Sequence, residues 1–172
     1  MPNPPVFQGV VFSSESAAET QQLARFLGEG CTGGETFLLV GTLGAGKTCF
    51  TQGLAWGLGV DEYTHSPTFV LVTEYHGRLT LYHIDLYRIE SVPEAIELGL
   101  EEYLASGGVT AIEWADKALD SLGGAGMVVE ILSQGDDRRT ITLRPVDTHH
   151  ETLLARLQAR RESRASQLEG SR

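Results

Sequence analysis

The segment around residues 36–58 constrains the fold of this chain more than any other. An apolar run of strand length at 36–40 precedes the sequence Gly41-Thr-Leu-Gly-Ala-Gly-Lys-Thr48, and a segment of helix length begins at Lys47. These residues match the pattern G-x-x-x-x-G-K-[ST], which requires a strand before it and a helix after it. Glycines let successive backbone N–H groups point at an anion, beside the positive end of the helix. We therefore predict that residues 41–48, called the glycine loop below, bind phosphate.

Two side chains of the glycine loop carry the chemistry that this pattern needs. Lys47 can reach the β- and γ-phosphates of a nucleotide, and the Thr48 hydroxyl can enter the coordination shell of Mg²⁺. Lys47 is one of only two lysines in the chain, which argues against a glycine-rich turn with an accidental lysine. The residues expected to contact the nucleotide in this segment are Gly41, Leu43, Gly44, Ala45, Gly46, Lys47, Thr48 and Cys49.

Two carboxylates stand at the ends of apolar strands and complete the predicted site. Residues 81–84 lead into Asp85, and residues 109–112 lead into Glu113. An acidic residue at such a position beside a phosphate site can hold Mg²⁺ or orient water. The alternative is that each acid caps a neighbouring helix. We take Lys47, Asp85 and Glu113 as candidate catalytic residues and Thr48, Asp85 and Glu113 as candidate metal ligands, with the inner-sphere carboxylate left open.

The order of expected elements predicts an α/β protein with a largely parallel central sheet and antiparallel hairpin additions. Ser16 and Glu19 have the spacing of a capping box, opening a helix that Gly28 and Gly30 then end. Strands are expected at 10–12, 36–40, 69–75, 79–84, 109–112, 127–132 and 140–143, and helices at 16–27, 47–58, 93–106 with a break at Gly99, and 152–164. We expect a nucleotide-binding domain over residues 1–150, then a basic helix and a disordered tail from about Ser163 within 151–172.

Charge is distributed unevenly along the chain. The net charge is −10, but residues 1–137 hold 5 basic and 19 acidic side chains, whereas residues 138–172 hold 8 and 4. The acidic body, at net −14, repels a phosphate backbone and is therefore a poor RNA surface. The basic segment, at net +4, is interpreted as a surface helix docked on the acidic body, with an RNA or partner contact as the alternative.

The remaining features indicate a cytoplasmic protein with no membrane segment. The first five residues lack the charged and apolar regions of a signal peptide, and no apolar run approaches the ~18 residues of a spanning helix. Cys31 and Cys49 are too few for a disulfide scaffold. His65, His76 and His83 lack the spacing of a metal site, and we expect them to be solvated or at the edge of the core.

Several stretches together resemble the TsaE family, small bacterial P-loop ATPases that support threonylcarbamoylation of tRNA adenosine next to the anticodon. Beside the glycine loop, these stretches are Ser66-Pro-Thr-Phe-Val-Leu-Val72, Tyr82-His-Ile-Asp-Leu-Tyr-Arg88, Glu97-Leu-Gly-Leu-Glu-Glu-Tyr103 and Ile112-Glu-Trp114. The resemblance covers roughly residues 7–114 and fades beyond Ala115. It implies a P-loop NTPase-like fold of three layers, with ATP and Mg²⁺ as cofactors.

The resemblance also implies roles for individual residues. Lys47 would hold phosphate, Thr48 would bind Mg²⁺, Asp85 would be the Walker-B-like acid, and Glu113 would hold the metal or orient water. Thr68 is similar to a switch threonine that senses the γ-phosphate, and its alternative is a turn residue that starts a strand. Trp114 would lie beside the nucleotide. Two positions depart from the usual family loop, namely Thr42, where Asp is common, and Cys49, where a second Thr is usual.

The resemblance implies TsaB- and TsaD-type partners, so the tie to tRNA would be indirect and run through them. With no clear arginine finger in the sequence, we expect slow hydrolysis by the isolated protein and completion of the site by partners. A small-molecule kinase is an alternative, although Arg78 and Arg88 are too few to make an obvious lid. A nucleotide-binding regulator without meaningful turnover is the other alternative.

Overall fold

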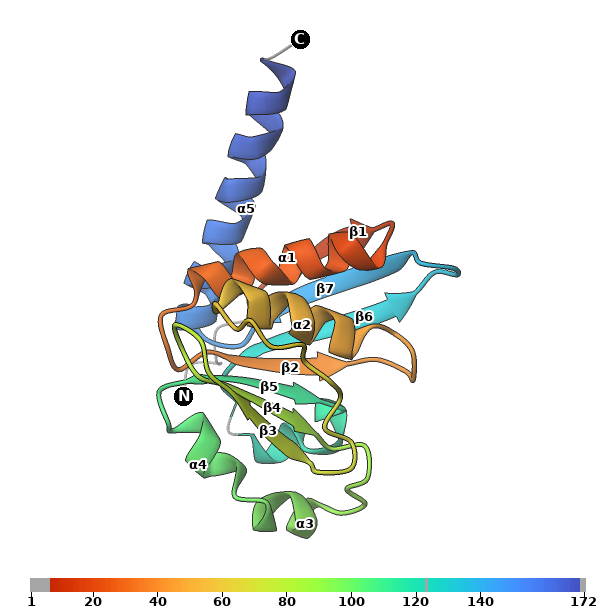
Figure 1. Cartoon of the computed structure of the whole chain (residues 1–172), viewed down its shortest axis with the longest axis vertical. Coiled ribbons are helices and arrows are strands. Elements are labelled where there is room, and N and C mark those ends of the chain that lie inside the picture. Colours follow the sequence, from red (N-terminus) through yellow and green to blue (C-terminus); the bar gives the residue numbers. More distant parts are fainter. Residues whose placement is uncertain (1–6, 123, 171–172) are drawn as a thin grey trace.

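The computed structural model describes residues 7–122 and 124–170, and it is built around one seven-stranded sheet with the order β1-β7-β6-β2-β5-β4-β3 (Figure 1). The five residues on which the signal-peptide expectation rests lie outside the described part. The strands are β1 (Val10–Ser14), β2 (Thr36–Val40), β3 (Val72–Tyr75), β4 (Leu81–Asp85), β5 (Val109–Glu113), β6 (Met127–Ser133) and β7 (Arg139–Pro145). Pairing is parallel for β4–β5, β5–β2 and β2–β6 and antiparallel at both edges, as the sequence predicts.

Helices cover both faces of this sheet and give the predicted three layers (Figure 1). They are α1 (Ala17–Gly30), α2 (Lys47–Gly57), α3 (Val92–Glu97), α4 (Leu100–Leu104) and α5 (Thr148–Glu169), with short 3₁₀ turns η1 (Ala115–Lys117) and η2 (Leu119–Ser121). Because side chains alternate along a strand, Phe37 and Leu39 of β2 join the core under α1 and α2. Leu38 between them joins the separate core under α3 and α4. Among the described residues, none of the helices is long and apolar enough to cross a membrane.

Glycines let α1 and α2 approach each other closely. A Cβ atom added to Gly53 would lie 2.1 Å from the Gln21 carbonyl oxygen, and one added to Gly57 would lie 2.2 Å from that of Arg25. Gly28 of α1 faces Gly57, and a Cβ atom added to it would lie 2.4 Å from the Leu54 carbonyl oxygen; the prediction that Gly28 ends the helix is wrong, and α1 continues to Gly30. Its lack of a side chain serves packing here, not chain termination. The contact fixes α2, and with it the glycine loop, against the rest of the domain.

The predicted strand at 69–75 begins later in the structure. Leu71 has φ 68°, which interrupts extended backbone, and β3 starts only at Val72. The Pro67 carbonyl oxygen accepts hydrogen bonds from the Val70 and Leu71 N–H groups, and the Leu71 carbonyl accepts from Asp85 N–H at 2.9 Å. The resulting turn leaves Phe69 86% exposed and holds the segment before it against the end of β4.

The basic C-terminal segment forms a longer helix than the sequence predicts. Helix α5 begins at Thr148, where the Asp147 carboxylate caps it by accepting the His150 N–H, and continues to Glu169. Residues 163–169, expected to be disordered, are therefore helical in the structure. The first half of α5 is buried against the body through Leu153, Leu154 and Leu157, and its C-terminal end projects beyond the body (Figure 1). The division of the chain at residue 150 stays a prediction, and that boundary falls in the first turn of α5.

Substitution of Gly53 tests the close contact of α1 with α2. In a helix, alanine is more favourable than glycine by roughly 1 kcal/mol. Gly53→Ala would therefore stabilise the protein if the added methyl group fitted between α1 and α2. Because the added Cβ meets backbone, we expect the free energy of unfolding in urea to fall by about 1–3 kcal/mol instead. Gly30→Ala is the matched control, since its added Cβ meets only the flexible end of Leu153. Equal stability of the two variants would contradict this interpretation.

Candidate functional site

The glycine loop connects β2 to α2 and leaves the start of that helix open. Gly44 and Gly46 have φ 76° and 112°, a region that other residues rarely adopt, and nothing lies within 4 Å of a Cβ added to Gly44. Gly46 caps α2 without a side-chain hydrogen bond. Within the described part of the chain, the first N–H groups of α2 thus have no side-chain acceptor at the positive end of the helix, which is the arrangement that suits an anion.

Lys47 crosses the loop beneath its tip. Its ammonium donates to the carbonyl oxygens of Gly41 at 2.7 Å and Thr42 at 2.9 Å, and it lies 4.0 Å from the centre of the Trp114 ring. Burial lowers the pKa of Lys47, while the negative charges of Glu113, Asp85 and Asp116 act in the opposite direction. A partly desolvated ammonium held among carbonyl groups and carboxylates is suited to binding the oxygens of a phosphate.

The two carboxylates predicted from the strand ends lie side by side. Asp85 is the register partner of Glu113 in the parallel β4–β5 pair, and both residues are almost fully buried. The Thr48 hydroxyl donates to Glu113 Oε1 at 2.8 Å, which joins the first turn of α2 to the end of β5. The sheet therefore brings residues 48, 85 and 113 to one place from three separate elements.

A loop between α2 and β3 supplies further hydroxyl groups to Asp85. The hydroxyls of Ser66 and Thr68 both donate to Asp85 Oδ2, at 2.7 and 2.8 Å, and lie 2.7 Å from each other. The other carboxylate oxygen, Oδ1, accepts the Tyr87 N–H at 2.8 Å. Thr68 thus reaches the predicted metal site, although it starts no strand.

The oxygen atoms gathered here fit Mg²⁺ better than a softer metal. Mg²⁺ is bound through one or two carboxylates, with hydroxyl, water and phosphate oxygens completing its octahedron. Within residues 7–122 and 124–170, no group of three or more His, Cys, Asp and Glu side chains is arranged to hold a metal. Two carboxylates and two threonine hydroxyls beside a phosphate-type loop are consistent with a magnesium ion shared with a nucleotide.

These groups line a single open pocket of about 380 Å³, within the range of small-molecule sites. Its lining residues are Leu43, Gly44, Gly46, Lys47, Thr48, Cys49, Ser66, Thr68, Asp85, Tyr87, Glu113 and Trp114. Of the residues expected to contact a nucleotide, only Gly41 and Ala45 are absent from this lining. The Gly41 carbonyl oxygen accepts a hydrogen bond from Lys47 and that of Ala45 accepts one from Arg139, so both residues help to hold the loop.

Sequence reasoning missed two residues that contact the predicted site groups. His83 was expected to be solvated or at the edge of the core, but it is fully buried, and its Nε2 lies 2.7 Å from Glu113 Oε1. Arg139, at the start of β7, donates from Nε to the Ala45 carbonyl at 2.7 Å and from Nη2 to that of Gly44 at 3.4 Å. The one available signal for His83 was its place two residues before Asp85, on the same face of β4. His65 and His76 are exposed, as expected.

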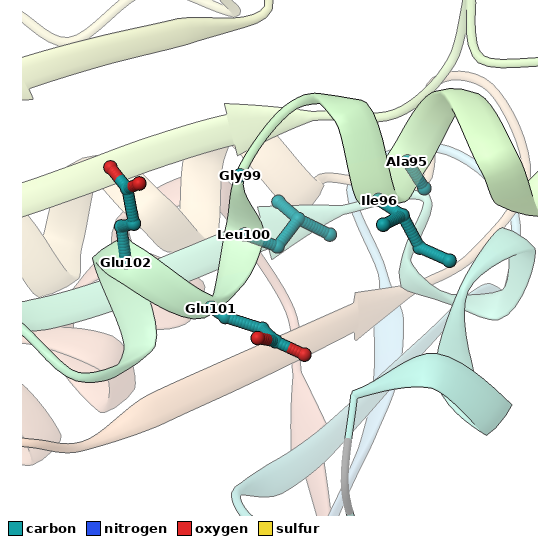
Figure 2. Close-up of a pocket in the computed structure, with 6 residues that line it drawn as sticks. All are labelled: Ala95, Ile96, Gly99, Leu100, Glu101 and Glu102. Carbon is teal, nitrogen blue, oxygen red and sulfur yellow. The ribbon is translucent and has the colours of Figure 1, made fainter.

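A second hollow, at the corner between α3 and α4, has different chemistry (Figure 2). It measures about 170 Å³ and is lined by Ala95, Ile96, Gly99, Leu100, Glu101 and Glu102. Figure 2 shows the two carboxylates pointing to different sides of α4. Because this lining contains two acids and no cationic group, it does not suit phosphate.

Fold and pocket together define a P-loop NTPase-like α/β protein, with its glycine loop at the carboxyl edge of parallel strands. Residues 14–141 match the family model described as "Threonylcarbamoyl adenosine biosynthesis protein TsaE". The chain therefore belongs to the TsaE family.

Known relatives agree with this assignment over most of the chain. The tRNA threonylcarbamoyladenosine biosynthesis protein TsaE of Treponema pallidum is 40% identical over 130 residues, which cover 76% of this chain and 96% of that protein. The Bacillus subtilis protein of the same name is 41% identical over 140 residues, covering 81% and 87%. The crystal structure of Bacillus subtilis YdiB superimposes with a TM-score of 0.79 and 32% identity, covering 91% of this chain and 98% of the other.

Removal of the Arg139 side chain tests whether β7 stabilises the glycine loop. A hydrogen bond from a charged group contributes about 1.5–3 kcal/mol, so Arg139→Ala should speed amide hydrogen exchange in residues 41–48 roughly tenfold or more. Arg138→Ala is the matched control, because this substitution removes the same charge from an exposed side chain one residue away. Unchanged exchange in the loop of Arg139→Ala would show that Arg139 does not hold it.

Proposed function

We propose that this protein is a Mg²⁺-dependent ATPase that supports threonylcarbamoylation of tRNA adenosine next to the anticodon, acting with TsaB- and TsaD-type proteins in the cytoplasm. The observation that carries the proposal is the meeting of the glycine loop, Thr48, Asp85, Glu113 and Thr68 in one pocket. Membership of the TsaE family supports the tRNA-modification role.

In the proposed complex, the N–H groups of the glycine loop and the Lys47 ammonium bind the phosphates of ATP. Thr48 and Glu113, already joined by a hydrogen bond, are the groups we assign to the metal, and Mg²⁺ when bound neutralises charge on the phosphate oxygens. Asp85 holds the hydroxyls of Ser66 and Thr68, which supports a role for Thr68 in sensing the terminal phosphate. Trp114 and Tyr87 supply apolar walls.

The charge of the pocket supports slow hydrolysis by the protein alone. Lys47 is the one cationic side chain among the described residues that line the pocket. Arg139 is near the loop but does not line the pocket, and its guanidinium donates to the carbonyl oxygens of Ala45 and Gly44. An arginine supplied by a partner raises phosphoryl-transfer rates by ~10³–10⁵ in related chemistry. We therefore expect TsaB- and TsaD-type proteins to complete the site. Fast turnover by the monomer, unaffected by these proteins, would contradict this part of the proposal.

Reconstituted tRNA modification tests the function as a whole. The reaction is run with tRNA, ATP, Mg²⁺ and the partner proteins, with and without this protein. We expect modification to depend on the wild type and to be lost with Lys47→Ala, because the phosphates lose their charged ligand. Arg144→Ala, which removes an exposed positive charge on β7, is the control and should behave as the wild type. Equal modification with Lys47→Ala would rule the proposal out.

Variants of the two carboxylates test the assigned chemistry separately from nucleotide binding. Asp85→Asn and Glu113→Ala should keep the change in tryptophan fluorescence that ATP causes, because the glycine loop is intact. Hydrolysis in the presence of partners should fall by at least roughly 10–100-fold, which is the loss typical of groups that only orient a metal ligand. Undiminished hydrolysis in both variants would refute their roles, and absence of hydrolysis by the wild type with partners would favour a non-hydrolysing regulator.

A further inference from the structure

A buried histidine stands directly behind the carboxylate that we assign to the metal. His83 lies on β4, two residues before Asp85, and its side chain has no exposed surface. Its Nε2 atom is 2.7 Å from Glu113 Oε1, the same oxygen that accepts the Thr48 hydroxyl at 2.8 Å. Among the described residues, no hydrogen bond involves the second oxygen, Oε2. One oxygen of Glu113 is thus held by two donors, while the other is left for a ligand.

The protonation pattern of the ring follows from this contact. A carboxylate oxygen only accepts hydrogen bonds, so His83 Nε2 carries a proton and donates it. The Nδ1 atom is also buried and has no partner within the described residues. A buried polar atom without a partner costs about 1–3 kcal/mol, a cost that an apolar side chain of similar shape avoids. Packing alone therefore does not account for a histidine at this position.

We propose that His83 is a positioning residue: its Nε2–H group fixes the Glu113 carboxylate so that Oε1 stays against Thr48 and Oε2 faces the metal. The proposal rests on the proposed function, since it concerns the same Mg²⁺ site. Side chains that orient a metal-binding carboxylate or histidine commonly change metal affinity or activity by 10–100-fold when they are removed. Here the orienting group comes from the strand next to that of its carboxylate, in the parallel β4–β5 pair.

Direct metal binding provides the test. Mn²⁺ is used as the probe, with a non-hydrolysable ATP analogue, and its affinity is measured by electron paramagnetic resonance on the full chain. His83→Phe should weaken Mn²⁺ binding roughly tenfold. Binding of the analogue in the absence of metal, measured by tryptophan fluorescence, should be unchanged. His83→Gln should recover most of the affinity, because its amide N–H can donate to Glu113 from a similar position.

Three further samples make each outcome decisive. His150→Phe removes a histidine that is also buried but is hydrogen-bonded to Asp147 and Thr36, so it should leave Mn²⁺ affinity unchanged even if stability falls. In a Glu113→Ala background, His83→Phe should cause no additional loss. His83→Leu replaces His83→Phe if the larger ring prevents folding.

Two results would overturn the role of His83. The first is a folded His83→Phe or His83→Leu variant that binds Mn²⁺ as tightly as the wild type. The second is a His83→Gln variant that loses as much Mn²⁺ affinity as His83→Phe, which would show that the effect is one of packing only. Failure of the proposed Mg²⁺–ATP site gives a different result, because the wild type itself would then bind neither the analogue nor Mn²⁺ with it.

Discussion

Parallel pairing of the three strands β4, β5 and β2 is the constraint on which the rest of the site depends. In a parallel sheet, all carboxyl ends lie at the same edge, and the register here sets Asp85 beside Glu113 and Glu113 beside Leu39, one residue before the end of β2. The glycine loop leaves that same edge from Val40. A shift of one residue in either pair would turn a carboxylate into the opposite face of the sheet. Because both faces are buried by separate cores, such a shift would also bury polar groups among apolar ones.

The register creates an electrostatic problem that the surrounding groups offset. Two adjacent buried carboxylates repel each other and lose hydration. Asp85 accepts hydrogen bonds from two hydroxyls and one backbone N–H, and Glu113 accepts them from Thr48 and His83. The Lys47 ammonium adds a positive charge, and its pKa is lowered by burial against the attraction of these acids. A local excess of negative charge beside an open helix N-terminus is the setting in which a divalent cation and a phosphate stabilise each other.

The sequence predicted the parts of this arrangement that depend on local pattern. The glycine loop, Asp85 and Glu113 were recognisable because each follows an apolar run of strand length, and strand ends meet in parallel sheets. The contacts of His83 and Arg139 could not be recognised from the sequence. His83 contacts Glu113, 30 positions away, and Arg139 contacts Ala45, 94 positions away. Gly28 was misjudged for a similar reason: only the opposing helix α2 shows that it serves a close contact. Register and helix packing, which decide such contacts, are properties of the whole fold and leave little local trace.

The structure shows where the basic residues of α5 lie relative to the acidic body. Arg160 forms an ion pair with Glu29 and lies over the Phe26 ring, which Arg164 also contacts, and Arg161 lies over Phe12. Three arginines of the basic segment are therefore held against α1 and β1 of the acidic body by their planar guanidinium groups. An interaction of this kind favours the docked surface helix over a freely extended RNA-binding arm, since phosphate would have to compete with contacts already made. The body that these arginines contact carries a net charge of −14 over residues 1–137, which makes it a poor surface for a phosphate backbone.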